Sequence, residues 1–256
     1  MKNIIMAIGT MSLISIMLLV SCNKNEKETA RLNVRLMDNP GQYDNVFVDV
    51  QGIQIHSNAG GWHSPSNFNA GIYDLLEFNN GMDTLLCTLD LPAGKVSQIR
   101  LILGSNNSVV VDGNTSPLET PSAQQSGLKL NLHQDLQANE SYTIWLDFDA
   151  AKSVVYTGNS SFILKPTIRA FSDLTDGKLK GVVEPMSTQP VVYAIQGTDT
   201  LSAIPNNDGS FMFCGLGGMY DVVVTPTDTT YQTEYINGVQ VTYGAINDLG
   251  VITLQP

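Results

Sequence analysis

The sequence predicts an all-β protein made of two antiparallel β-sandwich domains in tandem. Two observations lead to this fold class. Apolar and polar residues alternate along nearly every segment after the N-terminal region, and no segment sustains helical periodicity for three turns. Turn-forming triplets separate these segments, among them NPG at 39–41, NNG at 79–81 and PAG at 92–94. Short strands joined by turns favour sandwiches, and the helices needed to cross over a parallel sheet are missing from the pattern.

The first element is a secretory signal peptide at residues 1–21. A single Lys2 precedes an apolar run at 4–20, which polar residues interrupt too often for a permanent membrane span. The run ends in LVSC (19–22), which resembles a bacterial lipobox. That resemblance implies cleavage before Cys22 and a lipid on its thiol. Residues 22–30 would then be the lipidated cysteine and its tether, and the lipid would anchor the protein to a membrane.

The tether also suggests a location. Asn23 stands where an Asp would favour retention in the inner membrane of enteric bacteria, and the charged run 24–28 is similar to the surface-export signals of Bacteroidetes lipoproteins. We therefore expect a cell-envelope, outer-membrane lipoprotein, with exposure at the surface as a further option. The formal net charge of −11 argues against nucleic acid as a partner.

The strands fall into two groups. Residues 31–171 form the first predicted sandwich, a polar, turn-rich stretch at 172–177 is the predicted linker, and 178–256 form a second, smaller sandwich. After lipidation of Cys22, Cys87 and Cys214 remain. Both stand in apolar alternation and far apart, so we expect two buried free thiols and no disulfide.

The smaller unit resembles the carboxypeptidase regulatory-like domain, a transthyretin-like sandwich. The match rests on GVV (181–183), NDGSFMF (207–213), GGMYDVVV (217–224) and DLGVITL (248–254). The resemblance implies a module that extends or props its neighbour, in a superfamily where some relatives bind starch-like glycans.

The larger unit resembles a Bacteroidetes lipoprotein family, domain of unknown function 4382. The match rests on RLMDNPGQYDNVFVDVQGIQIH (35–56), LPAGKVSQIRLILG (91–104), TPSAQQSGLKL (120–130), LDFDAAKSV (146–154) and LKPTIRA (164–170). This family brings no assigned reaction, so the resemblance transfers no catalytic residue.

Acidic residues offer one candidate site. Asp147 and Asp149 lie on one face of a predicted strand, about 7 Å apart, and paired carboxylates can bind calcium or share acid–base work. They stand opposite an apolar face, where solvation also explains them. The turn residues Asp38, Asp44 and Asp74 could complete a calcium site. Otherwise no cofactor is expected.

The histidines are a second candidate. His56 and His63 flank a predicted hairpin and could approach each other as metal ligands, although two ligands do not make a site. The alternative is that both are exposed hairpin residues.

Sugar binding is a third candidate. Trp62 could stack on a sugar ring, and Gln124, Gln125 and Ser126 offer polar groups for hydroxyls in an uncharged loop. No nucleophile elbow surrounds Ser126, so this loop is not expected to be catalytic.

Two functions remain. The first is a non-enzymatic envelope module with no catalytic residue, which binds a glycan or another envelope protein or does structural work. The alternative is a metal-assisted hydrolase that uses the Asp147/Asp149 face, which requires Asp49, Asp147, Asp149 and a histidine to converge in one pocket. A Lys–Asn isopeptide bond joining Lys178 or Lys180 to Asn247 is a minor further possibility.

Overall fold

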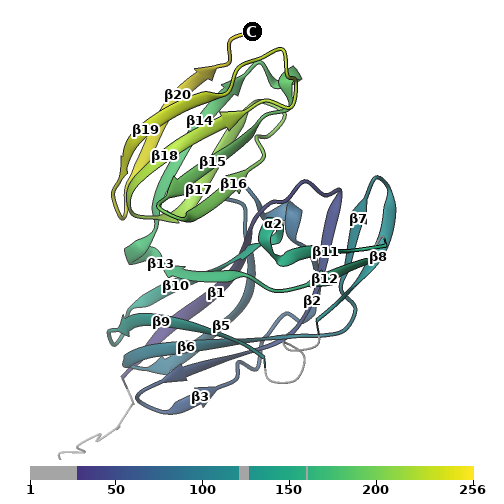
Figure 1. Cartoon of the computed structure of the whole chain (residues 1–256). Helices are drawn as coiled ribbons and strands as arrows, with labels where there is room; N and C mark the ends of the chain where they lie inside the picture. The colour runs from purple at the N-terminus through teal and green to yellow at the C-terminus, as the bar shows by residue number, and fades with distance from the viewer. Residues whose placement is uncertain (1–27, 121–126, 160) are drawn as a thin grey trace, which may run out of the picture.

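The computed structural model describes residues 28–120, 127–159 and 161–256. Nearly all of its regular structure is β-strand, arranged in two stacked sandwiches (Figure 1). The prediction of an all-β sandwich fold is confirmed. The signal peptide, Cys22 and the tether up to residue 27 lie outside the described residues.

The N-terminal sandwich packs a four-stranded sheet on a nine-stranded one. The small sheet has the order β13-β10-β1-β5. Its strands are β13 (Ile168–Ser172), β10 (Ser141–Asp149), β1 (Thr29–Asn39) and β5 (Thr84–Pro92). The large sheet has the order β11-β12-β8-β7-β2-β6-β9, and two further strands, β3 and β4, pair with β2. Its strands are β11 (Val154–Gly158), β12 (Ser161–Leu164), β8 (Asn114–Glu119), β7 (Ser108–Val111), β2 (Asn45–Ser57), β6 (Gly94–Leu103), β9 (Leu128–Leu136), β3 (Gly61–His63) and β4 (Gly71–Asp74).

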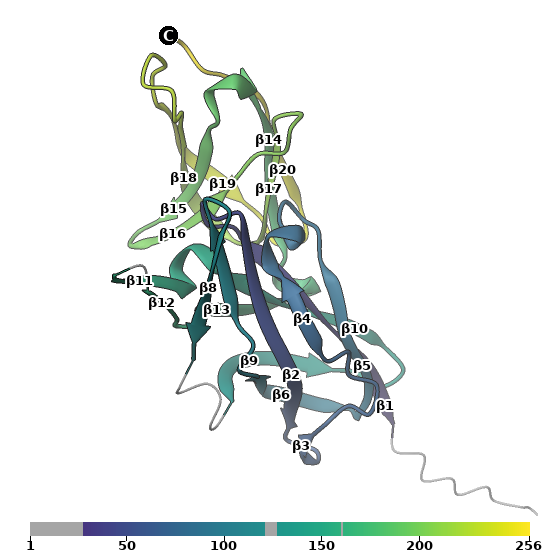
Figure 2. The same ribbon diagram turned by 90° about the vertical axis from the view of Figure 1, so that its right-hand side faces the viewer.

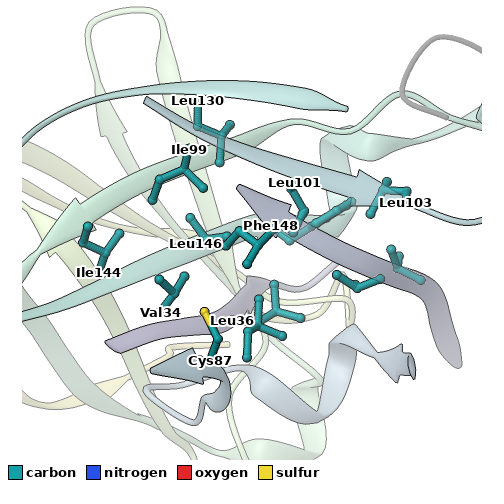
Figure 3. Packing of buried hydrophobic residues seen from close by; sticks show 14 of the residues in the cluster. Val34, Leu36, Cys87, Ile99, Leu101, Leu103, Leu130, Ile144, Leu146 and Phe148 are labelled. Atoms are coloured by element: carbon teal, nitrogen blue, oxygen red, sulfur yellow. The ribbon is translucent and has the colours of Figure 1, made fainter. Parts of the chain in front are cut away.

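The core of this sandwich follows from the period-two pattern. Leu36 of β1 and Phe148 of β10 point from the small sheet toward Leu101 of β6 in the large one (Figure 3). All three side chains are fully buried. Burial of each such side chain is worth about 1.5–3 kcal/mol, so the alternation fixes which face of every strand turns inward.

The C-terminal sandwich contains two smaller sheets. One has the order β17-β14-β20 and the other β16-β15-β18-β19. Their strands are β17 (Ser210–Leu216), β14 (Gly177–Glu184), β20 (Ile246–Thr253), β16 (Asp199–Ala203), β15 (Val191–Gln196), β18 (Gly218–Thr225) and β19 (Glu234–Val241). The two sandwiches have separate apolar clusters, and the C-terminal cluster includes Phe211 and Phe213. A short 3-10 helix, η2 (Asp173–Thr175), joins them within the segment predicted to be a linker.

Among the described strands, three pairs run parallel, which the sequence analysis did not anticipate. They are β1 with β10, β8 with β12, and β14 with β20. A parallel pair needs a crossover, and each crossover here runs mainly through other strands of the same sandwich. Within the described ranges we find no helix long and apolar enough to cross a bilayer.

The two ends of the described chain lie at opposite ends of the molecule. β1 begins beside β3 and the edge of the N-terminal sandwich, while the C-terminus lies at the far end of the second sandwich (Figures 1 and 2). The chain is therefore elongated along the direction in which the two sandwiches are stacked.

Candidate functional site

The predicted carboxylate face is buried, not solvated. Asp147 and Asp149 do lie on the face of β10 opposite Phe148, but their exposures are 0% and 4%. The reason is the parallel pairing of β1 with β10, which sets Met37 beside Asp147, and Met37 belongs to an apolar cluster with Cys214 of the second sandwich. The face of β10 that carries Asp147 and Asp149, which was predicted to be exposed to solvent, therefore lies in the junction between the sandwiches.

Asp147 is held by a cation at this junction. Its Oδ2 accepts hydrogen bonds from Arg169 Nε at 2.7 Å and from Asn39 Nδ2 at 2.6 Å. The same guanidinium donates to the carbonyl oxygens of Cys214 at 2.7 Å and Gly215 at 3.0 Å, both in β17. Arg169 thus neutralises a buried charge of the first sandwich and binds the backbone of the second, so we call Arg169, Asp147, Cys214 and Gly215 the junction clamp.

Aromatic packing reinforces the junction clamp. The rings of Trp145 and Phe171 stack with centroids 5.5 Å apart, against the cluster of Met37 and Cys214. Trp145 Nε1 donates to Asp83 at 2.7 Å. An apolar layer beside the ion pair strengthens it, because it lowers the local dielectric.

Polar contacts extend the junction on both sides. Asn80 donates to the carbonyl of Ile204 at 2.9 Å and accepts from the amide of Met212 at 3.2 Å. Ser202 donates to the carbonyl of Pro40 at 3.1 Å, and Lys152 bonds Asp199 at 3.2 Å. The sandwiches are therefore joined over a broad area and not only through the η2 connection.

Asp149 has a local structural partner. Its Oδ1 accepts from the Lys152 amide at 2.9 Å, which caps the one-turn helix α2 (Ala150–Ser153). The Lys152 ammonium lies 3.1 Å from its Oδ2. Burial raises the pKa of Asp149, and the Lys152 contacts oppose that shift. Both oxygens are thus engaged by the helix that follows the strand.

Asp49 belongs to a different place. It lies on β2 of the large sheet, 2% exposed, where its Oδ2 accepts from the amide of Asn106 at 3.2 Å and its Oδ1 accepts from Gln51. Within residues 28–120, 127–159 and 161–256, no three Asp, Glu, His or Cys side chains are grouped closely enough to hold a metal. The convergence that the hydrolase alternative requires is absent from that part of the chain.

The histidines do not form a pair. The predicted hairpin is present, but Trp62 stands opposite His56, and His63 stands opposite Ile55. Since neighbouring positions point to opposite faces of a sheet, His56 and His63 face away from each other. His56 Nδ1 lies 2.9 Å from Ser97 Oγ, and His63 Nε2 lies 3.1 Å from Ser57 Oγ. The metal-pair hypothesis for them is wrong for this geometric reason.

Among the described acids near the junction, Asp38 has the most strongly raised pKa. It is 3% exposed, its Oδ1 accepts from the Ala150 amide at 2.9 Å, and its Oδ2 finds no hydrogen-bond partner among the described residues. Burial raises its pKa well above the usual value; the Ala150 bond lowers it, and Asp147, Asp149 and Asp74 raise it further. We infer that the fold holds Asp38 protonated well above the pH at which a free aspartate ionises.

Asp38→Asn should therefore stabilise the protein increasingly as pH rises. Because the folded-state pKa is raised, the stability tied to protonated Asp38 is complete below the unfolded-state pKa of about 3.9 and is lost as pH rises through the folded-state value. Asparagine keeps the acceptor for Ala150 and cannot ionise. In thermal melting from about pH 3 to about pH 8, the Tm of Asp38→Asn should exceed that of the wild type by an amount that increases with pH. Asp112→Asn, at an exposed turn, is the control, and an unchanging gap for Asp38→Asn would contradict the assignment.

Trp62 is accessible, whereas the predicted loop partners lie outside the described residues. The Trp62 ring is 39% exposed, with the Arg100 guanidinium 4.4 Å from its centroid and the His56 ring packed edge-on at 5.1 Å. Gln124, Gln125 and Ser126 fall in the range 121–126, outside the described residues. The sequence analysis missed Arg100, whose position on the polar phase of β6 was the available signal.

The remaining groups are structural. Cys87 and Cys214 are free and buried, as predicted, and burial raises the pKa of each thiol to about 12. Lys178 and Lys180 pair with Asp176 at 3.3 Å and Asp248 at 3.1 Å, while Asn247 donates to the Gln240 carbonyl. The described contacts therefore do not place Asn247 against either lysine.

A groove of about 390 Å³ lies beside the junction. Its lining comes from both sandwiches: Pro40, Gly41, Gln42, Tyr43, Ala151, Val191, Tyr193, Ser202 and Ile204. These residues include no carboxylate, imidazole, thiol or amine. The groove could hold a neutral ligand, but it contains no acid–base pair for hydrolysis.

Comparison with known proteins places the larger unit in a described family. The model of the family described as "Domain of unknown function (DUF4382)" matches residues 29–166. No curated protein sequence matches the chain.

Several solved structures match the chain at low sequence identity. The Bacillus anthracis TIE protein matches at 10% identity and a TM-score of 0.24, over 89% of this chain and 34% of that one, so this chain spans about a third of its length. The shaft pilin SpaA from Lactobacillus rhamnosus GG matches at 10% identity and a TM-score of 0.23, over 89% and 98% of the two chains. A leucine-rich repeat protein from Bacteroides thetaiotaomicron matches at 11% identity and a TM-score of 0.20, over 89% and 26%. Superpositions this poor do not establish a common fold.

Proposed function

The chain belongs to the DUF4382 family, and from its geometry we propose that it is a non-enzymatic, lipid-anchored structural and binding module of the cell envelope. The observation that carries the proposal is the junction clamp. The two acids of the predicted hydrolase face have structural partners: Asp147 is bound to Arg169, which holds one sandwich on the other, and Asp149 is bound to Lys152 of the helix that follows its strand. A rigid, elongated body suits a protein that projects a surface away from its anchor.

The anchor is Cys22 in this proposal, with residues 1–21 removed as a signal peptide and 22–30 serving as tether. The start of β1 and the C-terminus lie at opposite ends of the described chain (Figure 1). A lipid on Cys22 would therefore hold the N-terminal sandwich near the membrane and place the C-terminal sandwich farther out. The carboxypeptidase regulatory-like resemblance of residues 178–256 supports the same role, because it implies a spacer. We propose the outer membrane as the location.

Binding is the second part of the proposal. Exposed Trp62 supports recognition of a glycan, and another envelope protein is the alternative partner. The N-terminal sandwich would be the binding unit.

Lipid labelling tests the anchor. Cells grown with an alkyne-bearing fatty acid should label the wild-type protein, which should sediment with the outer membrane. Cys22→Ser should abolish the labelling and release the protein from that fraction. Labelling that persists in Cys22→Ser would remove the anchor from the proposal.

Distance measurement tests the rigid body. Spin labels at Asn114→Cys, the exposed first residue of β8, and at Thr229→Cys, in an exposed turn of the second sandwich, leave the buried native thiols unlabelled. Pulsed electron paramagnetic resonance should give one narrow distance distribution. A broad distribution would mean that the sandwiches move independently, and the structural role would fail.

A further inference from the structure

The outward sides of strands β3, β2, β6 and β9 carry polar and charged side chains beside Trp62. Arg100 of β6 stands between Gln54 of β2 and Lys129 of β9 in the sheet register. Gln98 stands between His56, which faces Trp62, and Asn131. The alternate residues Ile55, Ile99 and Leu101 are fully buried, so these side chains point outward. We call Trp62, Lys95, Gln98, Arg100, Lys129 and Asn131 the Trp62 face.

The cations of this face lack the partners that cations have elsewhere. Among the described residues, six Lys and Arg side chains form ion pairs with carboxylates and four do not. The paired ones are Arg31, Arg35, Lys152, Arg169, Lys178 and Lys180. Three of the other four, Lys95, Arg100 and Lys129, belong to the Trp62 face, and the fourth is Lys165. In a chain of net charge −11, this gathering of unpaired positive charge is unusual.

The arrangement also works against stability. Arg100 and Lys129 stand directly opposite each other on neighbouring strands, and like charges in that position repel. The one acidic residue of β9, Asp135, stands opposite Lys95. It lies six residues from Lys129 along the strand, so it does not stand between Arg100 and Lys129. An anion placed between Arg100 and Lys129 would relieve the repulsion.

The neighbours of these cations suit a saccharide. Arg100 is held over the Trp62 ring at 4.4 Å and donates to Gln54 Oε1 at 3.0 Å, so its guanidinium is oriented without being neutralised. Gln98 Nε2 donates to Asn131 Oδ1 at 3.1 Å, which leaves amide donors and acceptors beside the cations. Trp62 adds an exposed apolar ring, and amides can bond hydroxyls.

We propose that the Trp62 face binds an acidic glycan, in which sugar carboxylates pair with Arg100 and Lys129 and ring hydroxyls bond the amides of Gln98 and Asn131. This inference rests on the proposed binding role and adds the class of ligand. Guanidinium and carboxylate form strong, charge-assisted hydrogen bonds.

Polygalacturonate and its fully methyl-esterified form make a matched pair of probes, because esterification removes the charge and keeps the backbone. Binding to the detergent-solubilised full-length protein can be measured by interferometry. We expect binding to the acid form, weakened by salt, and little binding to the ester. Arg100→Gln with Lys129→Gln should weaken binding at least about tenfold. Lys165→Gln, which removes an unpaired charge elsewhere, should change it less than about twofold.

Each other outcome overturns the inference in a distinct way. Equal binding of acid and ester would leave a glycan-binding module without charge recognition. No binding to either polymer would remove this face as a glycan site, while the anchor and rigid-body experiments would still stand. Binding to phosphatidylglycerol vesicles alone, lost in the double variant, would make the face a membrane contact. Melting curves check that the glutamine variants remain folded.

Discussion

Arg169→Ala should lower the stability of the whole chain more than any surface substitution. It leaves the Asp147 carboxylate, which is 0% exposed, without its cation, and it removes the two hydrogen bonds to the carbonyls of β17. Removal of one partner from a buried pair costs about 3–5 kcal/mol. For a chain of this size that corresponds to a fall in Tm of about 10 °C, measured by differential scanning calorimetry.

The controls separate burial from charge. Arg31→Ala breaks an ion pair with Asp90, but the two side chains are 60% and 54% exposed, so we expect a much smaller fall in Tm than for Arg169→Ala. Arg169→Ala combined with Asp147→Asn removes the stranded charge and should recover part of the loss. If Arg169→Ala melted like Arg31→Ala, the junction clamp would not hold the sandwiches together.

The fold class could be read from the sequence because period-two alternation acts locally. The apolar side chains of Ile99 and Leu101 indicate which face of their strand is buried, and this can be predicted without identifying the partner strand. The parallel pairing of β1 with β10 could not be read in this way, since it joins segments more than one hundred residues apart. That pairing decides what covers Asp147. The prediction therefore placed Asp147 and Asp149 correctly on one face of the strand. Its expectation that solvent covers this face was wrong, because both side chains are buried.

The candidate sites show the same division. Trp62 was found from its residue type and its hairpin, because both are local features. Arg100 became a candidate only when the register set it beside Trp62 and opposite Lys129. Arg169 was part of a recognised segment, but its role depends on carbonyls about 45 residues further along the chain. Polar residues of a sandwich thus acquire their function from sheet register and from what packs on the sheet.

Gly215→Ala should be the second large effect, and it acts on the junction itself. Gly215 has φ +66, and a Cβ there would lie 2.4 Å from Cδ1 of Phe171. The left-handed conformation costs a non-glycine residue roughly 1–2 kcal/mol. Overpacking against the ring adds roughly 1–3 kcal/mol. Urea unfolding should therefore show a loss of roughly 2–5 kcal/mol.

Gly250→Ala is the matched control. Gly250 has φ +69 in the same sandwich, but nothing lies within 4 Å of the added methyl group, so it incurs the backbone strain alone. The difference between the two variants measures the contact with Phe171. Because Phe171 stacks on Trp145, a displaced ring should also change Trp145 fluorescence, which can be isolated in a Trp62→Phe background. Equal losses in both variants and an unchanged Trp145 signal would mean that β17 does not press on the first sandwich. From the close packing we expect a larger loss for Gly215→Ala and a changed Trp145 signal. The absence of a side chain at Gly215 lets β17 approach Phe171 closely enough for its carbonyls to accept hydrogen bonds from Arg169.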